Sequence, residues 1–461
     1  MSGQLELDRL RRYAHTQGGR LYAGAVAGGL IFADPQHALL VLGPPRSGKT
    51  SAVAIPNVLA APGAVVTTSI KPDVLAATVP SRAEMGRCWL LDPTGSIQVD
   101  PLGVTRLRWS PVAAASTWDE SLVIARSMTG AARPSGRLGD SAHWTERAEA
   151  LLGPLLHAAW LSGADMETVL RWTLRQEDQP AQTVLHAHGV QTAADVLGGI
   201  SARDRRELSG IWSSLAGVLA AYRSDSVLDN SSGINFDPAG FVRSNDTVYV
   251  CAPARHQELA APIVVAFLEQ VRAAAYSALS EVGAAVPAAP QVTMVLDELA
   301  NIAPLPDLPG LVAEGGGQGV MTVGCLQDLS QARVRWGAAA DGFLSLFGAK
   351  LVLPGIGDLS TLELVSRLGG EIDLPTRTVS RASPWGPGMG AATVSWSTTR
   401  QRRIPAEAVN QLPRGTALLL SGSRPPENIP LPPWWLVEPF ARTTRARALE
   451  PRSAEVRTLG W

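Results

Sequence analysis

The sequence predicts an α/β fold built on a parallel β-sheet, and two observations support this prediction. Short apolar runs rich in β-branched residues alternate with longer helical patterns, which is typical of a parallel sheet covered by helices on both faces. One such run, His37–Leu42, ends at a glycine-rich turn, and Ser51–Ile55 can open a helix directly after it. The turn fits the pattern G-x-x-x-x-G-K-[ST] of a phosphate-binding loop between a strand and a helix.

The residue types in this turn suit a nucleoside triphosphate. Backbone N–H groups of the turn and of the following helix point at the phosphates. We expect Lys49 to bridge the β- and γ-phosphates and the Thr50 hydroxyl to ligate Mg²⁺. Of the 40 basic residues only Lys49, Lys71 and Lys350 are lysines, so a chain that otherwise uses arginine keeps a compact ammonium here. The predicted nucleotide-binding residues, with ATP and Mg²⁺ as ligands, are Gly43, Pro44, Pro45, Arg46, Ser47, Gly48, Lys49 and Thr50.

The bulk composition limits the class of protein. The chain has 461 residues, of which 46% are apolar and 18% charged, and this predicts a globular protein of two or three domains. The formal net charge of −1 gives no global field that attracts nucleic acid, so any such surface must be local. Cys88, Cys251 and Cys325 each lie in an apolar strand-like run, which predicts buried thiols in a reducing compartment.

The N-terminal region carries no signal for membrane insertion. The apolar stretch Leu21–Phe32 is shorter than the ~20 residues that a membrane helix needs. Its glycines favour a β-hairpin that leads into the strand before the phosphate-binding loop. The first residues are polar and show no secretory signal. We therefore expect a cytoplasmic protein that can dock peripherally on a membrane complex through a partner.

Further strand candidates follow in order, with one long helical interruption. Residues 112–240 carry apolar positions at three- and four-residue intervals, as in Thr145–Leu152 and Arg203–Leu208. This segment is predicted to be an all-α domain inserted into the α/β domain. The other strand candidates are Ala64–Thr68, Cys88–Asp92, Thr247–Cys251, Val292–Leu296, Met321–Cys325 and Lys350–Leu353.

An acidic motif complements the phosphate-binding loop. Thr293–Leu296 is predicted as a strand that ends in Asp297 and Glu298, and we expect it to neighbour the loop strand. Asp297 would hold the Mg²⁺ shell through water, and Glu298 would polarise the attacking water as general base. The Asp-Glu pair favours hydrolysis over phosphoryl transfer to a substrate. The alternative is an ordinary strand that ends in a solvated acidic turn.

Two other strand ends carry polar residues expected at the same edge of the sheet. Gln327 can touch the γ-phosphate and report its presence, or it is a polar residue with no role. Lys71 and Asp73 can contact nucleotide, a neighbouring subunit or each other, and the sequence does not choose among these. The predicted catalytic residues are Glu298, Lys49 and Gln327, and the predicted metal ligands are Thr50 and, through water, Asp297.

The ordered set of motifs resembles that of the type IV coupling proteins, the hexameric ATPases of conjugation and type IV secretion. It spans about residues 20–435, and the order is more specific than any single motif. The resemblance implies a RecA-like P-loop NTPase sheet with an inserted all-α domain, in a homo-hexameric ring that engages DNA or a relaxase–DNA complex. The motifs are Gly43–Thr50, Ser69–Asp73, His143-Trp144-x-x-x-Ala148, Leu296–Glu298, Gln327–Gln331 and Ile404-Pro405-x-x-x-Val409-x-x-Leu412-Pro413.

We divide the chain into four parts on this basis. Residues 1–111 are expected to form an N-terminal ribbon and the first part of the motor domain, and residues 112–240 the inserted all-α domain. Residues 241–436 complete the motor domain with the Walker B and sensor motifs. Residues 437–461 are expected to be a mobile arginine-rich tail.

The chain departs from the family pattern in three places. The predicted helical insert carries arginines and acidic residues in similar number, so its charge alone does not indicate a DNA-binding patch. Family members usually begin with a membrane-spanning anchor, which this sequence does not show, so we expect a partner to supply it or the protein to act away from the membrane. The segment Glu314–Gly319, where the family often carries a basic residue that acts on a neighbour's γ-phosphate, holds glycines and a glutamine instead. Arg333, Arg335 and Arg255 are unranked candidates for this arginine finger.

Basic residues gather around the Gly/Pro/Trp/Ser-rich stretch Ala382–Ser397. A flexible loop with arginines and tryptophans can meet phosphates and stack bases, whereas the alternative is a solvated surface loop without a role. The predicted DNA contacts are Arg377, Arg381, Trp385, Arg400, Arg402 and Arg403, with Trp396 in the same stretch.

We interpret the chain as an ATP-hydrolysing, coupling-protein-like motor. It would recruit or move DNA, expected to be single-stranded, or a relaxase–DNA complex toward a type IV secretion channel. One alternative is a cytoplasmic ring DNA translocase unrelated to secretion, which the predicted helical insert disfavours. Another is an interaction protein that binds nucleotide and hydrolyses little, which the missing basic residue near Gly316 favours.

Overall fold

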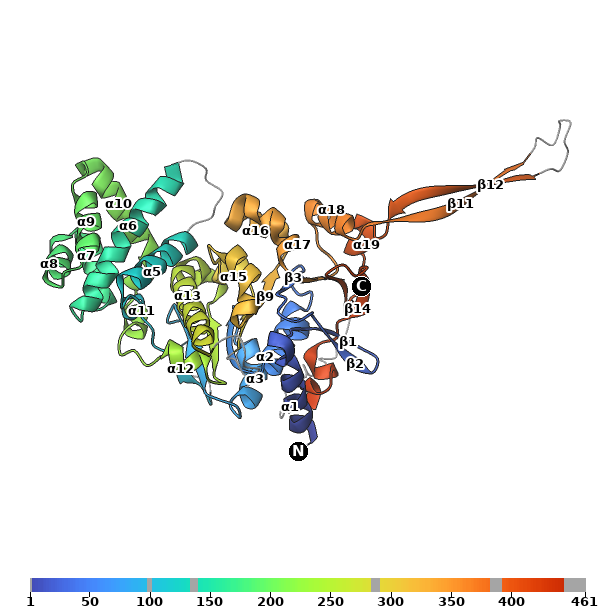
Figure 1. The fold of residues 1–461 in the computed structure, drawn as a ribbon, viewed down its shortest axis with the longest axis horizontal. Helices are drawn as coiled ribbons and strands as arrows, with labels where there is room; N and C mark the ends of the chain where they lie inside the picture. The colour runs from blue at the N-terminus through green and yellow to red at the C-terminus, as the bar shows by residue number, and fades with distance from the viewer. Residues whose placement is uncertain (1, 98–101, 133–139, 283–290, 382–391, 443–461) are drawn as a thin grey trace, which may run out of the picture.

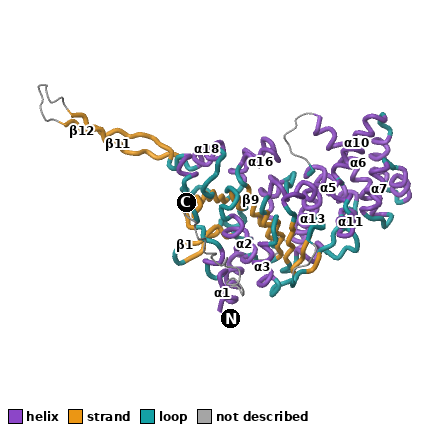
Figure 2. The backbone as a smooth tube through the Cα atoms, turned by 180° about the vertical axis from the view of Figure 1, so that it is seen from behind, coloured by secondary structure: helices purple, strands orange, loops and turns teal. Residues whose placement is uncertain are grey.

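A central β-sheet lies between a lobe of helices and a long two-stranded ribbon that projects from the opposite end of the molecule (Figure 1). The same three regions follow one another in the view from behind (Figure 2). The structure is a computed structural model, and it describes residues 2–97, 102–132, 140–282, 291–381 and 392–442.

The central sheet has ten strands in the order β14-β13-β10-β3-β9-β8-β4-β7-β5-β6. From β10 to β6 all pairings are parallel, and β13 and β14 add an antiparallel edge. All seven strand candidates, including the one before the phosphate-binding loop, are confirmed as members of this sheet. The strands are β3 (Leu39–Leu42), β4 (Ala64–Ser69), β5 (Cys88–Leu91), β6 (Thr105–Arg106), β7 (Thr247–Cys251), β8 (Val292–Leu296), β9 (Val320–Leu326), β10 (Ala349–Val352), β13 (Thr416–Ser421) and β14 (Glu427–Pro430).

The strand that carries the acidic motif does not neighbour the loop strand, and this expectation was wrong. β9 pairs with β3 on one side and with β8 on the other, so it separates the two. Chain order does not determine spatial order in a parallel sheet, because every pairing is made through a crossover connection.

Both faces of the sheet are buried, which explains why its strands are continuous apolar runs. In β3 the side chains of Leu40 and Leu42 enter one core, and those of Leu39 and Val41 enter the other. α13 to α19 contribute to the first core and α1 to α3 to the second. These helices are α1 (Ser2–Ala14), α2 (Ile55–Ala60), α3 (Asp73–Arg82), α13 (Gln257–Val282), α14 (Leu299–Ile302), α15 (Leu308–Glu314), α16 (Leu329–Trp336), α17 (Phe343–Leu346), α18 (Leu359–Leu368) and α19 (Ala406–Asn410).

The described residues between β6 and β7 form helices and no strand, and they make up the lobe in Figure 1. Thr117 begins α5 with a capping box to Glu120, and Asp204 begins α10 by accepting from two backbone N–H groups. The domain boundaries at 112 and 240 stay a prediction. The helices are α4 (Pro111–Ala114), α5 (Trp118–Ala131), α6 (Asp140–Leu161), α7 (Met166–Arg175), α8 (Gln179–Ala187), α9 (Gln191–Ser201), α10 (Arg205–Val218), α11 (Asp225–Asn230) and α12 (Pro238–Val242).

One helix among the described residues, Ala254–Glu281, is long and apolar enough to pass a composition test for a membrane span. Its most apolar window is 67% buried inside the protein, and α13, which makes up most of it, packs against α5. A core helix passes the same test, so this finding is weak evidence for a span.

The predicted N-terminal hairpin is present, whereas the predicted C-terminal tail begins too early. β1 (Tyr22–Val26) and β2 (Gly29–Phe32) pair antiparallel. Val437 and Phe440, placed in the tail by the sequence, are buried in the core with α1 and β1. The prediction of a mobile tail was therefore wrong for residues 437–442, because it relied on the arginine content of the segment and overlooked these two apolar residues. Residues 443–461 lie outside the described part.

The ribbon consists of β11 (Glu371–Arg381) and β12 (Ala392–Arg402), which pair antiparallel along their whole length (Figure 1). The prediction of a flexible loop over 382–397 was therefore wrong from residue 392 onward. Alternating Thr, Val and Trp residues in this part favour a strand despite the nearby glycines. Residues 382–391, including Trp385, lie outside the described part.

The three cysteines are free and buried, as predicted. Burial raises the pKa of the Cys88 thiol to about 11 and that of Cys251 to about 12. Both thiols therefore stay protonated at neutral pH and act as small apolar residues.

Candidate nucleotide-binding site

The phosphate-binding loop connects β3 to a π-helical turn, η2 (Thr50–Ala54), which continues into α2. Gly48 has a φ of 100° and Arg46 a φ of 63°, so the backbone curls through conformations that few L-residues adopt. The buried Lys49 ammonium donates to the carbonyl oxygens of Gly43 at 2.5 Å and Pro44 at 3.0 Å. The ammonium thus lies within the curl of the loop, and Lys49, Thr50 and Ser51 line the same cavity.

The acidic strand reaches the loop through one short contact. The Thr50 hydroxyl donates to the Asp297 carboxylate at 2.6 Å, although β9 lies between their two strands. The Thr68 hydroxyl donates to the Asp297 carbonyl at 2.7 Å and fixes the end of β8. The pKa of Asp297 is raised to about 6, chiefly because burial disfavours the charged carboxylate; the neighbouring Glu298 carboxylate adds to this rise and the Thr50 hydrogen bond opposes it.

Glu298 stands in the left-handed region, with a φ of 57° and a ψ of 45°. A non-glycine residue in this conformation costs of order 1 kcal/mol and turns the chain sharply out of the strand. The Asn301 side chain donates to the Glu298 carboxylate at 3.1 Å and orients it. The strained turn therefore brings two successive carboxylates to the same cavity.

That cavity has a volume of about 600 Å³ and receives residues from both predicted motifs. The side chain of Asp73 accepts from the Ser69 hydroxyl at 3.2 Å and from the Val74 N–H at 2.9 Å, and no ion pair joins it to Lys71. Gln327 follows β9 as predicted but does not line the cavity. The lining residues are Pro45–Ser51, Ile55, Ser69–Lys71, Asp73, Ala76, Ala77, Asp297, Glu298, Trp434 and Trp435.

The residues present fit a nucleoside triphosphate with Mg²⁺. Ser47 Oγ is buried in the loop and has no hydrogen-bond partner, which is the state expected of a group that contacts a ligand. Thr50 and Asp297 present oxygen atoms of the kind that Mg²⁺ prefers, on the same side as the Lys49 ammonium.

The predicted DNA contacts divide into two groups on the ribbon. Arg400 pairs with Glu371 and Asp373, and Arg402 pairs with Glu371, at 3.4–3.8 Å. Arg377 instead lies directly across from Trp396 on the same face, and the Trp396 side chain is 68% exposed. The sequence placed all these arginines in one group, because it cannot show which of them face a carboxylate.

The remaining basic candidates occupy different settings. Arg403 is exposed at the base of the ribbon, and its N–H donates to Gly370. Arg381 ends β11. Arg333 is held by Asp341 at 2.9 Å and by Asp358, whereas Arg255 is exposed after β7. Burial lowers the pKa of Arg335, the third arginine-finger candidate, against the raising effect of Glu258.

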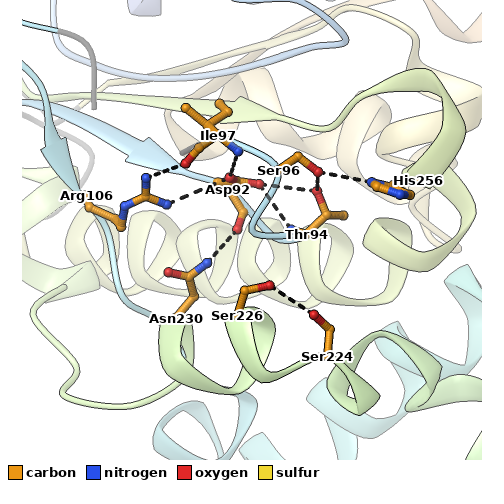
Figure 3. A network of polar contacts seen from close by, with 9 residues as sticks. All are labelled: Asp92, Thr94, Ser96, Ile97, Arg106, Ser224, Ser226, Asn230 and His256. Carbon is orange, nitrogen blue, oxygen red and sulfur yellow. Dashed lines mark hydrogen bonds and ion pairs between the residues drawn. The ribbon is translucent and has the colours of Figure 1, made fainter. Parts of the chain in front are cut away.

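A second polar cluster lies at the end of β5 and was missed by the sequence analysis (Figure 3). The buried Asp92 carboxylate accepts from the Ile97 N–H at 2.6 Å and from the Thr94 N–H and hydroxyl at 3.2 Å. The Asn230 side chain at the end of α11 donates to the Asp92 carbonyl at 3.0 Å. Asp92 therefore connects the sheet to the helical lobe. In the sequence it is a single aspartate after a strand candidate, and this pattern is too common to predict a structural role.

The loop, the acidic strand end and the interposed β9 define a RecA-like P-loop NTPase fold, the class that the sequence predicted. The chain belongs to the family "Type IV secretory system Conjugative DNA transfer", whose model matches residues 7–454. The predicted resemblance is thereby confirmed. No curated protein matches the chain.

Solved structures of a coupling protein share this fold. The unbound bacterial conjugative coupling protein TrwBdeltaN70 is 18% identical, with 92% of this chain and 90% of that chain covered and a TM-score of 0.66. The plasmid coupling protein TrwB in complex with ADP and Mg²⁺ is 19% identical, with 92% and 91% covered and a TM-score of 0.65. TrwB in complex with the non-hydrolysable GTP analogue GDPNP is 19% identical, with the same coverage and a TM-score of 0.66.

Proposed function

We propose that this protein is an ATP-hydrolysing motor that recruits or moves DNA, or a relaxase–DNA complex, to a type IV secretion channel. The observation that supports the ATPase activity best is the 2.6 Å contact between Thr50 and Asp297, with Glu298 beside it in the cavity of the phosphate-binding loop. Membership of the conjugative DNA transfer family supports the cargo and the channel.

Each residue of the site has a role in this proposal. Lys49 holds the β- and γ-phosphates, and the loop N–H groups and Ser47 hydroxyl bind their oxygens. Thr50 and, through water, Asp297 would hold Mg²⁺, which would supply positive charge to offset the negative charge of the triphosphate. Glu298 accepts the proton of the attacking water. Gln327, at the end of β9, lies outside the cavity lining, so sensing the γ-phosphate would require its side chain to move toward the loop.

We propose that the ribbon contacts DNA, and that only some of the basic residues predicted from the sequence make this contact. No carboxylate occurs in the sequence from Leu374 to Thr399. Arg377 is therefore available for phosphates and Trp396 for stacking on a base. Arg381 ends β11, and Trp385 follows it in the sequence, outside the described residues. Arg400 and Arg402 are instead ion-paired with acidic side chains of the ribbon.

The ring and its location follow from the family in this proposal. We propose a homo-hexamer on the cytoplasmic face of the membrane, with a partner linking it to the channel. The exposed Arg255 after β7 is the arginine-finger candidate that is most accessible to a neighbouring subunit, because Arg333 is held by two carboxylates of its own chain.

Steady-state ATP hydrolysis at low salt tests the proposal, with and without single-stranded and duplex DNA and with Lys49→Ala as the blank. DNA-stimulated turnover that disappears in the blank is expected. Tight ATP binding with negligible turnover under all conditions would instead support a nucleotide-binding interaction protein. Stimulation by duplex DNA alone would favour a DNA translocase unrelated to secretion.

A further inference from the structure

The nucleotide cavity extends beyond the phosphate-binding loop to a wall that none of the sequence motifs predicts. Ile55 borders it one turn into the helix after the loop, and Ala76 and Ala77 border it from the first turns of α3. Trp434 and Trp435 complete this wall from the C-terminal segment. The cavity thus combines a charged region at Lys49, Thr50 and Asp297 with an apolar one.

The two tryptophans reach the cavity because the chain returns across the sheet after β14. Pro432 and Pro433 stiffen the connection, and the short 3₁₀ turn η7 (Trp434–Leu436) packs against η2 directly after the phosphate-binding loop. The Val437 N–H donates to the Trp434 carbonyl at 3.2 Å and closes the turn. Phe440 then enters the core and anchors the segment.

Trp434 and Trp435 play different parts in this wall. Trp434 is 3% exposed and belongs to the core beneath α1 and α2, so its ring is fixed by packing. Trp435 is only partly buried, and its ring lies edge to face with that of Trp434 at a centroid distance of 6.0 Å and an angle of 82°. Trp434 therefore positions an indole ring that borders the cavity.

We propose that Trp435 is the stacking platform for the nucleobase of the bound nucleotide. This inference rests on the proposed function, because it places the triphosphate in the loop at the charged region of the same cavity. A purine has two flat, weakly polar faces, and an indole is the largest flat surface that a side chain offers. The methyl-sized side chains of Ala76 and Ala77 leave room for a ring next to it.

The composition of the wall also predicts the specificity of the site. Ile55, Ala76 and Ala77 have no side-chain hydrogen-bonding groups that could read the edge of a base. Stacking is tolerant of base identity because every base has a π-face. The site would therefore discriminate little between adenine and guanine nucleotides.

Calorimetry tests this inference. The full chain, in the presence of Mg²⁺, is titrated with ATP, with GTP and with inorganic tripolyphosphate. Trp435→Ala is expected to weaken ATP and GTP binding by roughly 10–100-fold, the loss measured for single base–aromatic stacks, and to leave tripolyphosphate binding unchanged. Trp435→Phe should recover most of the affinity because it keeps a flat ring, whereas Trp435→Leu should not. Trp160→Ala, which removes a partly exposed indole from α6 in the helical lobe, outside the cavity, is the matched control.

The outcomes separate this inference from the proposed function. Wild-type ATP affinity in Trp435→Ala, together with lost affinity in Lys49→Ala, would overturn the stacking role and leave the ATPase proposal standing. An equal loss of ATP and tripolyphosphate affinity in Trp435→Ala would mean that the ring only supports the loop, and would also overturn the inference. Absence of ATP and tripolyphosphate binding by the wild-type chain would remove both proposals.

Discussion

The nucleotide site and the ribbon are two candidate functional regions built in opposite ways. The nucleotide site takes residues from the loop after β3, the start of the helix that follows it, the end of β4, the turn after β8, α3 and the C-terminal segment. Its backbone rests on a sheet buried on both faces. The ribbon is a single pair of strands whose described side chains are mostly exposed (Figure 1). Isolated two-stranded hairpins are marginally stable in water, so we expect the ribbon to be less rigid than the nucleotide site, whose backbone is held in shape by the core.

This difference predicts that a substitution of a catalytic residue in the nucleotide site changes ATP turnover and leaves DNA binding by the ribbon unchanged. Glu298→Gln should lower ATP turnover by about 10²–10⁴-fold while ATP binding and DNA binding stay at the wild-type level, because only the general base is lost. Turnover and binding measured side by side check this, with Glu314→Gln, an exposed glutamate outside the cavity, as the control. Unchanged turnover would remove Glu298 as the base.

The framework of the nucleotide site should be sensitive to a single buried side chain. The guanidinium of Arg82, which is fully buried, donates to the carbonyl oxygens of Ala61, Gly63 and Asn245 at 2.7–2.9 Å. Arg82→Ala leaves these carbonyls unpaired beside a cavity and should lower the free energy of unfolding by about 3–5 kcal/mol, measured by urea denaturation.

The matched control is Arg424→Ala, which removes an exposed ion pair with Asp34 and should cost less than about 1 kcal/mol. A similar effect of the two substitutions would mean that the core does not hold the site in the way we describe. The burial of Arg82 also lowers its pKa to about 10, because desolvation disfavours the charged form.

Shortening the ribbon should separate the two regions most directly. Replacement of residues 375–398 by Asn-Gly joins Leu374 to Thr399, which are register partners, through a two-residue turn. Basal ATP turnover and thermal stability should be unchanged, and the stimulation of turnover by DNA should be lost. Loss of basal turnover would show that the ribbon belongs to the structural framework of the motor.

Within the ribbon, the two groups of arginines should behave differently toward DNA. Arg377→Ala removes one expected phosphate contact, so the slope of log K against log salt for single-stranded DNA should become shallower by about 0.7. Fluorescence anisotropy of a labelled oligonucleotide over a salt series measures this. An unchanged slope would remove Arg377 from the DNA contacts.

The smallest effect is expected for Arg402→Gln. Arg402 pairs with Glu371 at 3.4 Å in a solvent-accessible position, so the loss should cost less than about 1 kcal/mol of stability and should leave the DNA salt slope as it is. A slope change equal to that of Arg377→Ala would mean that the ion pair opens and that both arginines meet phosphates.

The sequence by itself determined those features that are formed by residues next to one another along the chain. The phosphate-binding loop needs its glycine, lysine and threonine at fixed spacing, because one strand-turn-helix unit makes the site. The apolar runs determined the strands for the same reason, since a strand buried on both faces has few polar positions. Asp297 and Glu298 were identified from the residues that precede them.

Only the tertiary structure decided which distant residues meet. It placed β9 between the loop strand and the acidic strand, set Arg377 opposite Trp396, and gave Arg400 and Arg402 acidic partners. It also brought Trp435 into the cavity from the far end of the chain. These contacts depend on strand order, register and the packing of whole elements, and such long-range terms have no signature in the spacing of residues along one sequence.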